Sequence, residues 1–147
     1  MKQIEINIKA EGKPSVRTMV LKNPIIYPSG KSRKVVSYMP KKSMKYREII
    51  TSEWIKKYGK SDTTSPVGIL IVCYFKPNKS DSKKQQEALI GQPYTKKPDW
   101  DNIGKNICDA LNGIAYKDDN QIYDATVQKW YAREDKIVIT AYFFGEE

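Results

Sequence analysis

The residues best suited to chemistry in this chain are six aspartates crowded into positions 96–124. They lie in the run KKPDWDNIGKNICDALNGIAYKDDNQIYD, at Asp99, Asp101, Asp109, Asp118, Asp119 and Asp124. Gathered carboxylates repel one another and favour a divalent cation, and oxygen ligands suit Mg²⁺ or Mn²⁺ better than zinc. Such a cation can polarise a phosphoryl oxygen and lower the pKa of a bound water, which is the chemistry of phosphodiester hydrolysis.

The composition removes several other kinds of active site. The chain of 147 residues contains no histidine, which excludes Ser-His-Asp and Cys-His catalysis and zinc hydrolysis based on His ligands. Its two cysteines, Cys73 and Cys108, have no CxxC spacing and indicate neither a disulfide scaffold nor a Cys-rich zinc site. A reducing cytosol fits this usage.

Asp99 and Asp101 come just before a predicted helix. Pro98 disfavours helix in the residue before it, so we expect both aspartates in an extended segment, where side chains two apart point to the same side. Asp101 or Asn102 is then the expected N-cap of the helix.

Asp118 and Asp119 follow that helix and precede a predicted strand, so the chain can bring this pair back to the first one. Lys105 lies one helical turn after Asp101 on the same face. There it could neutralise the charge that develops on a scissile phosphate or its leaving oxygen.

Each of these residues also has an ordinary structural role to weigh against the metal site. Asp101 can be a simple helix cap, Asp118 and Asp119 can form a turn, and Lys105 can pair with Asp101 or Asp109 on a solvated face. An EF-hand is a poor match, because Ile103 and Ala110 stand where such a loop needs an oxygen ligand and a bidentate glutamate.

Charge is distributed unevenly along the chain. Residues 1–60 hold 15 Lys+Arg against 4 Asp+Glu, net +11, whereas residues 61–147 hold 11 against 13, net −2. The basic half suggests a polyanionic partner, although a lysine-rich solvated surface is the alternative. The candidate contacts to DNA phosphates are Arg33, Lys34, Lys41, Lys42, Lys45, Lys96 and Lys97.

Patterning predicts the elements that must position these residues. Strands are expected at 3–10, 16–21, 67–75, 121–131 and 136–144, with the last two forming a hairpin. Helices are expected at 44–58, capped by Ser43 and stopped by Gly59, and at 102–112, followed by Gly113. Residues 23–42 and 77–98 are predicted loops, the 77–95 part flexible with a short helix possible near 82–90.

This order predicts an α+β class, in which one small domain over residues 1–147 packs two principal helices on a mixed sheet. No segment approaches the roughly 20 apolar residues that span a bilayer, so we expect no membrane protein. The N-terminus also lacks the apolar region of a secretory signal.

The aspartate-rich stretch resembles the signature of the RusA family of Holliday junction resolvases. That signature runs through a basic residue, D-x-D-N-x-x-K, D-A-L, D-D-x-Q-V and a strand ending in Lys. It is met here by Lys97, Asp99, Asp101, Asn102, Lys105, Asp109, Ala110, Leu111, Asp118, Asp119, Gln121, Ile122 in place of Val, and Lys129. The basic run before Asp99 is shorter than in the family, and residues 77–95 and 1–15 look longer than a minimal member needs.

The resemblance implies a homodimeric, Mg²⁺-dependent endonuclease that binds four-way DNA junctions and nicks two opposing strands, with Mn²⁺ as the alternative metal. Asp99, Asp101 and Asp119 would be catalytic metal ligands, Asp118 their neighbour at the metal, and Lys105 the catalytic lysine. Asp109 would have a structural or supporting role.

A bacterial cytoplasm, often with a phage or prophage gene, is also implied, and no nucleotide cofactor is expected. Two other functions stay open: a nuclease for forks or flaps built on the same frame, and a non-catalytic DNA-binding module.

Overall fold

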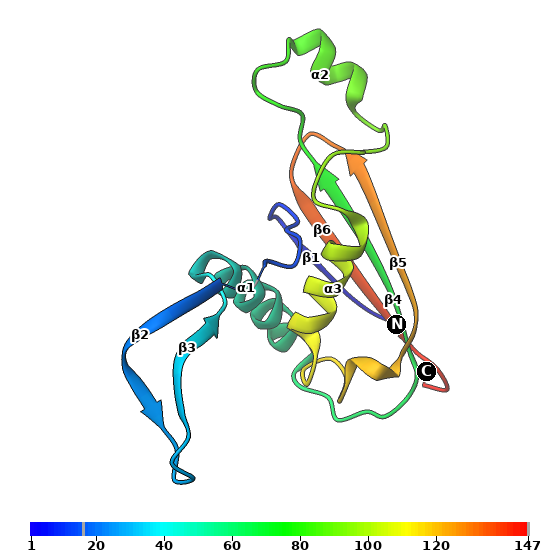
Figure 1. Cartoon of the computed structure of the whole chain (residues 1–147). Helices are drawn as coiled ribbons and strands as arrows, with labels where there is room; N and C mark the ends of the chain where they lie inside the picture. The colour runs from blue at the N-terminus through cyan, green and yellow to red at the C-terminus, as the bar shows by residue number, and fades with distance from the viewer. Residues whose placement is uncertain (16, 147) are drawn as a thin grey trace.

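The computed structural model describes residues 1–15 and 17–146. It shows a four-stranded sheet with two long helices packed on it and a two-stranded ribbon that extends away from this body (Figure 1). The elements in chain order are β1 (Lys2–Ile6), β2 (Arg17–Ile26), β3 (Ser32–Tyr38), α1 (Lys41–Tyr58), β4 (Val67–Phe75), α2 (Lys83–Leu89), α3 (Trp100–Leu111), a 3₁₀ turn (Asp119–Gln121), β5 (Ile122–Tyr131) and β6 (Lys136–Phe143). The predicted α+β class is confirmed.

The apolar run of β4 forms an interior strand, as its composition predicts. The strand order is β1-β6-β4-β5, with β4 antiparallel to β6 and parallel to β5. Ile69, Ile71 and Cys73 of β4 are buried among the residues that the helices cover. Because parallel neighbours need a long crossover, the chain between β4 and β5 has room for both α2 and α3.

The predicted hairpin between residues 121–131 and 136–144 is wrong. β5 and β6 pair with opposite edges of β4, so their connection passes over the end of that strand (Figure 1). The connection is bound there, because Ala132 N donates to Phe75 O at 3.0 Å and Lys76 N donates to Asp135 Oδ1 at 3.0 Å. The buried backbone of β4 needs hydrogen-bond partners along both edges, and a β5–β6 hairpin would leave one edge without them.

The long loop predicted over residues 23–42 is also wrong, because β2 and β3 pair as an antiparallel ribbon. Gly30, with a φ of +82°, closes the turn by donating its N–H to Tyr27 O at 2.9 Å. Pro24 is tolerated since the pairing is interrupted between Val20 and Ile25 and both strands have a free edge. The predicted strand 16–21 falls within β2, except for Val16, which lies outside the described residues.

The two long helices bury one side each and so fix which side of α3 faces outward. α1 buries Tyr46, Ile50 and Trp54, and α3 buries Ile103 and Ile107, all at helical spacing. α1 and α3 therefore pack against each other, α1 also contacts β1 and α3 also contacts β5, and both helices share one core with the sheet. Within residues 1–15 and 17–146, no helix combines the length and apolar character needed to cross a membrane.

The observed ends of α1 and the short helix α2 differ in part from the predicted ones. α1 begins at Lys41 with Pro40 as N-cap, so the predicted cap at Ser43 is wrong; Ser43 N donates to Pro40 O at 3.0 Å inside the first turn. The predicted stop at Gly59 is confirmed, with a φ of +70°. The short helix allowed near 82–90 is α2, which starts with a capping box. The flexibility of its surroundings stays a prediction.

Candidate active site

The start of α3 lies earlier than the sequence predicts. Asp99 is the N-cap, with extended backbone, and Ile103 N donates to Asp99 O at 3.1 Å. The prediction of Asp101 or Asn102 as cap is therefore wrong, and Asp101 lies inside the first helical turn instead of in an extended segment. Pro98 restricts only the residue before it, so the helix can begin directly after Asp99.

A hollow of 360 Å³ lies between α3 and β5. It is lined by Trp100, Asp101, Gly104, Lys105, Cys108, Asp109, Asp119, Ile122, Ala125 and Val127. Of the predicted catalytic set, Asp101, Lys105 and Asp119 thus share one hollow, although the chain returns through a whole helix between them. Asp99 and Asp118 are not among its lining residues.

Gly104 permits the close contact that forms the floor of this hollow. A Cβ at this position would lie 3.2 Å from Cγ2 of Val127 on β5, so a larger residue would require either the Val127 side chain or the helix to shift slightly. Ile122, Ala125 and Val127 make the floor apolar. The carboxylates therefore stand at the edges of an apolar surface, where charges interact more strongly than in bulk water.

Asp101 and Lys105 face outward and have only weak mutual contact. Lys105 Nζ lies 3.7 Å from Asp101 Oδ2, and the two side chains are 61% and 46% exposed respectively. Exposed pairs of this kind contribute about 0–1 kcal/mol, so they hold each other loosely. Both groups are free to meet a ligand.

The Asp118–Asp119 pair is held in place by Gln121. Asp118 N donates to Gln121 Oε1 at 2.8 Å, and Gln121 Nε2 donates to the carbonyls of Thr63 and Ser65 at 2.9 Å. The glutamine of the D-D-x-Q pattern thus anchors the turn to the segment before β4. Sequence spacing showed this residue but not its partners.

Negative charge is concentrated around Asp119. Partial burial raises the pKa of its carboxyl, as do the hydrogen bond and charge of Asp118 and the charge of Asp109, while Lys13 opposes the shift. A carboxyl with a raised pKa marks a place where a further positive charge is favoured.

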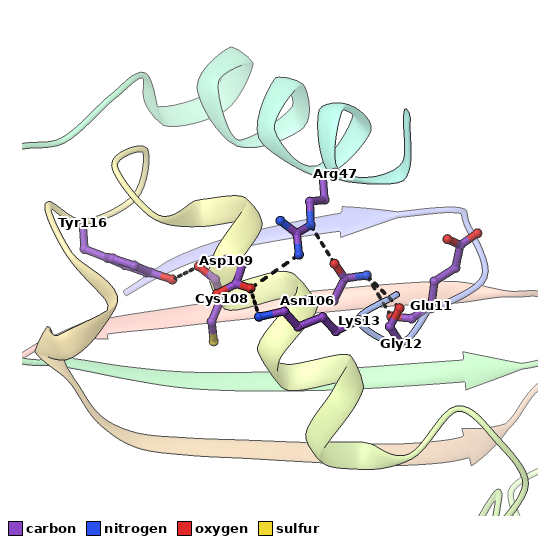
Figure 2. Close-up of polar contacts among 8 residues, drawn as sticks. All are labelled: Glu11, Gly12, Lys13, Arg47, Asn106, Cys108, Asp109 and Tyr116. Atoms are coloured by element: carbon purple, nitrogen blue, oxygen red, sulfur yellow. Dashed lines mark hydrogen bonds and ion pairs between the residues drawn. The ribbon is translucent and has the colours of Figure 1, made fainter. Parts of the chain in front are cut away.

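Asp109, which also lines the hollow, is tied to α1 and to the loop after β1 by a polar network (Figure 2). Its Oδ2 lies 2.9 Å from Lys13 Nζ and 3.4 Å from an Nη atom of Arg47. Arg47 Nε donates to Asn106 Oδ1 at 2.8 Å, and the amide of Asn106 donates to the Glu11 carbonyl at 3.2 Å. This network joins α3 to α1 and to the loop after β1.

Sequence reasoning did not single out Arg47, Asn106 or Lys13. The available signal was Asn106, a polar residue on the otherwise apolar side of α3 between Ile103 and Ile107. Its side chain is fully buried, and a buried amide requires hydrogen-bond partners.

Cys108 also lines the hollow but is not suited to act as a nucleophile. Burial raises the pKa of its thiol to about 11, so the thiol is protonated at neutral pH. Both Cys108 and Cys73 are free, in line with the absence of a disulfide scaffold predicted from their spacing.

The donor atoms of the hollow suit a hard cation, because they are carboxylate oxygens. Across residues 1–15 and 17–146, however, His, Cys, Asp and Glu side chains form no group of three or more close enough to hold a metal ion.

The basic residues predicted to contact DNA are all exposed and lie in three parts of the chain. Lys96 and Lys97 directly precede α3, Arg33 and Lys34 lie on β3, and Lys41, Lys42 and Lys45 lie in the first turns of α1. Trp100, which also lines the hollow, is 61% exposed.

Comparison with known proteins agrees with this arrangement. The family model described as Endodeoxyribonuclease RusA matches residues 11–142, a range that includes the ribbon, both long helices and the hollow. A Bacillus subtilis (strain 168) protein described as uncharacterized protein YqaN is 34% identical over 105 residues, which cover 68% of this chain and 73% of the relative. The chain belongs to the RusA family of endodeoxyribonucleases.

Proposed function

We propose that this protein is a Mg²⁺-dependent endonuclease that resolves four-way DNA junctions by paired nicks. The observation that supports the proposal most directly is that Asp101, Lys105 and Asp119 line one hollow. Exposed lysines on the segment before α3 add a surface for phosphates beside that hollow.

Asp99, Asp101 and Asp119 are the proposed metal ligands, with Asp118 beside them. The fit rests on donor chemistry: Asp101 and Asp119 line the hollow with carboxylate oxygens, and Asp99 is the N-cap two residues before Asp101. When bound, Mg²⁺ or Mn²⁺ would supply Lewis-acid stabilisation of the phosphoryl group and a more acidic water.

The protein's own side chains would bind and orient the scissile phosphate. Lys105, held near Asp101 on the exposed side of α3, would offset the charge that builds on the phosphate and its leaving oxygen. Lys96 and Lys97 would bind flanking phosphates, while the apolar floor of Ile122 and Val127 would limit water around the reacting group.

Arg33, Lys34, Lys41 and Lys42 would bind the arms of the junction, since they are exposed and lie on the ribbon and the start of α1. A four-way junction is resolved by two matched cuts, and a homodimer would supply two symmetric sites for them.

The test is a nicking assay on a synthetic four-arm junction, a fork and a plain duplex, each with Mg²⁺ and with EDTA. We expect paired nicks on the junction with Mg²⁺ and none with EDTA. Preference for the fork would favour a flap- or fork-directed nuclease, and binding without any nick would favour a non-catalytic DNA-binding module.

Asp101→Asn tests the site itself. We expect loss of nicking with junction binding kept or tightened, because a negative charge near the phosphate is removed. Asp124→Asn is the matched control, since Asp124 lies on β5 in a different hollow beside Gly68 and Tyr142. Normal nicking by Asp101→Asn would remove Asp101 from the reaction.

A further inference from the structure

The segment that leads into α3 carries Lys96, Lys97 and Asp99. Its carbonyls accept hydrogen bonds from two side chains, those of Lys129 and Tyr94. Lys129 Nζ donates to Lys96 O at 2.7 Å and to Pro98 O at 2.9 Å. Between them, Lys97 O accepts from the hydroxyl of Tyr94 at 3.1 Å. Three successive carbonyls are thus held by side chains that approach from β5 and from the start of the same segment.

Lys129 reaches this position from the sheet. It lies on β5 opposite Cys73 of β4, and its side chain is half-buried. Its ammonium lies 5.5 Å from the ring centre of Tyr94. Tyr94 stacks on Phe75, with ring centres 4.0 Å apart, so the surface beneath the ammonium is itself packed against the core.

The charge of Lys129 is satisfied by neutral groups. Among the described residues no carboxylate lies within ion-pair distance of it, and its contacts are two carbonyl oxygens and an aromatic face. An ammonium has three donors, and two of them are already used. A lysine in this state is poorly placed to bind a DNA phosphate and well placed to hold a backbone in shape.

We propose that Lys129 is a positioning residue that folds the 96–98 backbone around its ammonium and thereby sets the place of Asp99 and the outward direction of Lys96 and Lys97. The proposal rests on the proposed function for its catalytic consequence, but the ordering of the backbone does not depend on it. Because an error of about 1 Å in a reacting group can cost about 100-fold in rate, a loosened segment should slow nicking.

Lys129→Met tests the proposal, because methionine matches the length of the buried stem and donates nothing. The first readout is the backbone order parameters of the full chain from ¹⁵N relaxation, which need no activity. We expect lower order parameters in residues 96–101 and unchanged ones in β4 and α1. The matched control is Lys136→Met, another strand lysine over an aromatic ring, that of Tyr74, whose ammonium pairs with Glu5 instead of backbone carbonyls.

The second readout separates positioning from DNA contact. For Lys129→Met we expect kcat for the four-way junction to fall about 10- to 100-fold, with KM and junction affinity changed less than about threefold. Lost affinity with normal kcat would make Lys129 a DNA contact and overturn the proposal. Unchanged order parameters in residues 96–101 would also overturn it.

Two further outcomes have clear meanings. If wild-type protein nicks no junction, the proposed function fails while the order parameters still decide the role of Lys129. If Lys129→Met loses order throughout the chain, the variant has lost its fold, and Lys129→Gln decides instead. Glutamine is shorter and uncharged, so it cannot replace both bonds to Lys96 O and Pro98 O, and unchanged order at residues 96–101 in that variant would overturn the proposal.

Discussion

The polar residues on the two sides of α3 differ in how their side chains are paired and buried. On the side toward α1, Asn106 is fully buried, and Asp109, which also lines the hollow, has both Lys13 and Arg47 as partners (Figure 2). On the side toward the hollow, Asp101 and Lys105 have a single loose contact at 3.7 Å. The first side therefore serves the fold, since buried polar groups must be paired, and the second leaves the charges of Asp101 and Lys105 exposed.

The strongest test of this contrast is Asn106→Leu. Leucine has a similar size but leaves the Nε of Arg47 and the Glu11 and Gly12 carbonyls without their buried partner. We expect the free energy of unfolding to fall by about 3 kcal/mol, measured by urea denaturation. A loss below about 1 kcal/mol would mean that the network is not what holds α3 to α1.

Lys105→Ala is the matched change on the other side of the helix. We expect junction nicking to fall about 100-fold, since a positive charge beside the phosphate is removed, with little loss of junction binding. Stability should change by less than about 0.5 kcal/mol, because Lys105 is 61% exposed. Normal nicking would remove Lys105 from the proposed reaction, and a large stability loss would erase the contrast between the two sides.

Gly104→Ala tests the close contact between α3 and β5 at the floor of the hollow. The new Cβ would lie 3.2 Å from Val127 Cγ2, and we expect this strain to outweigh the helix propensity of alanine. The predicted net loss is about 1 kcal/mol in thermal or urea unfolding.

Val127→Ala should rescue Gly104→Ala, because it removes the methyl group that the new Cβ meets. The double variant is expected to be at least about 1 kcal/mol more stable than the sum of the single losses predicts. Simple additivity would show that α3 shifts freely and that Gly104 does not set the depth of the hollow.

The sequence predicted the features that depend on local patterns. Amphipathic spacing such as Tyr46–Ile50–Trp54 identified the helices, and the apolar run of β4 identified the central strand, because these signals are local. Aspartates and Lys105 stood out because their types suggest chemistry. Chain direction suggested that the aspartates meet, and Asp101 and Asp119 do line one hollow with Lys105, whereas Asp99 and Asp118 do not.

The wrong hairpin and the overlooked polar contacts depend on partners distant in sequence, whereas the missed ribbon and the misplaced helix caps are local. The short 132–135 connection resembles a hairpin turn, but β4 takes both flanking strands as its own neighbours. Pro24 and Pro28 suggested a loop, but a ribbon with two free edges tolerates them. The roles of Arg47 and Lys129 depend on carbonyls and carboxylates tens of residues away, which no local pattern records.

The smallest expected effect concerns an ion pair whose two side chains are both exposed to solvent. Glu87 of α2 contacts Arg133 through both carboxylate oxygens, with Oε2 at 2.9 Å from the guanidinium. The hydrogen bond from Arg133 lowers the pKa of Glu87 below its usual value. The stabilisation is therefore present above the unfolded pKa of about 4.3 and is lost as the pH falls through the folded value.

Glu87→Gln should consequently lower the melting temperature by less than about 2 °C at neutral pH, because solvent and salt screen an exposed pair. The difference from wild type should shrink as the pH falls below about 4.3 through the lowered folded pKa of Glu87, and it should also shrink in about 1 M salt. Melting curves over a series of acidic pH values and at both salt concentrations measure it. A loss as large as that of Asn106→Leu would mean that pairing alone, without burial, stabilises this protein, and the contrast between the two sides of α3 would then need another cause.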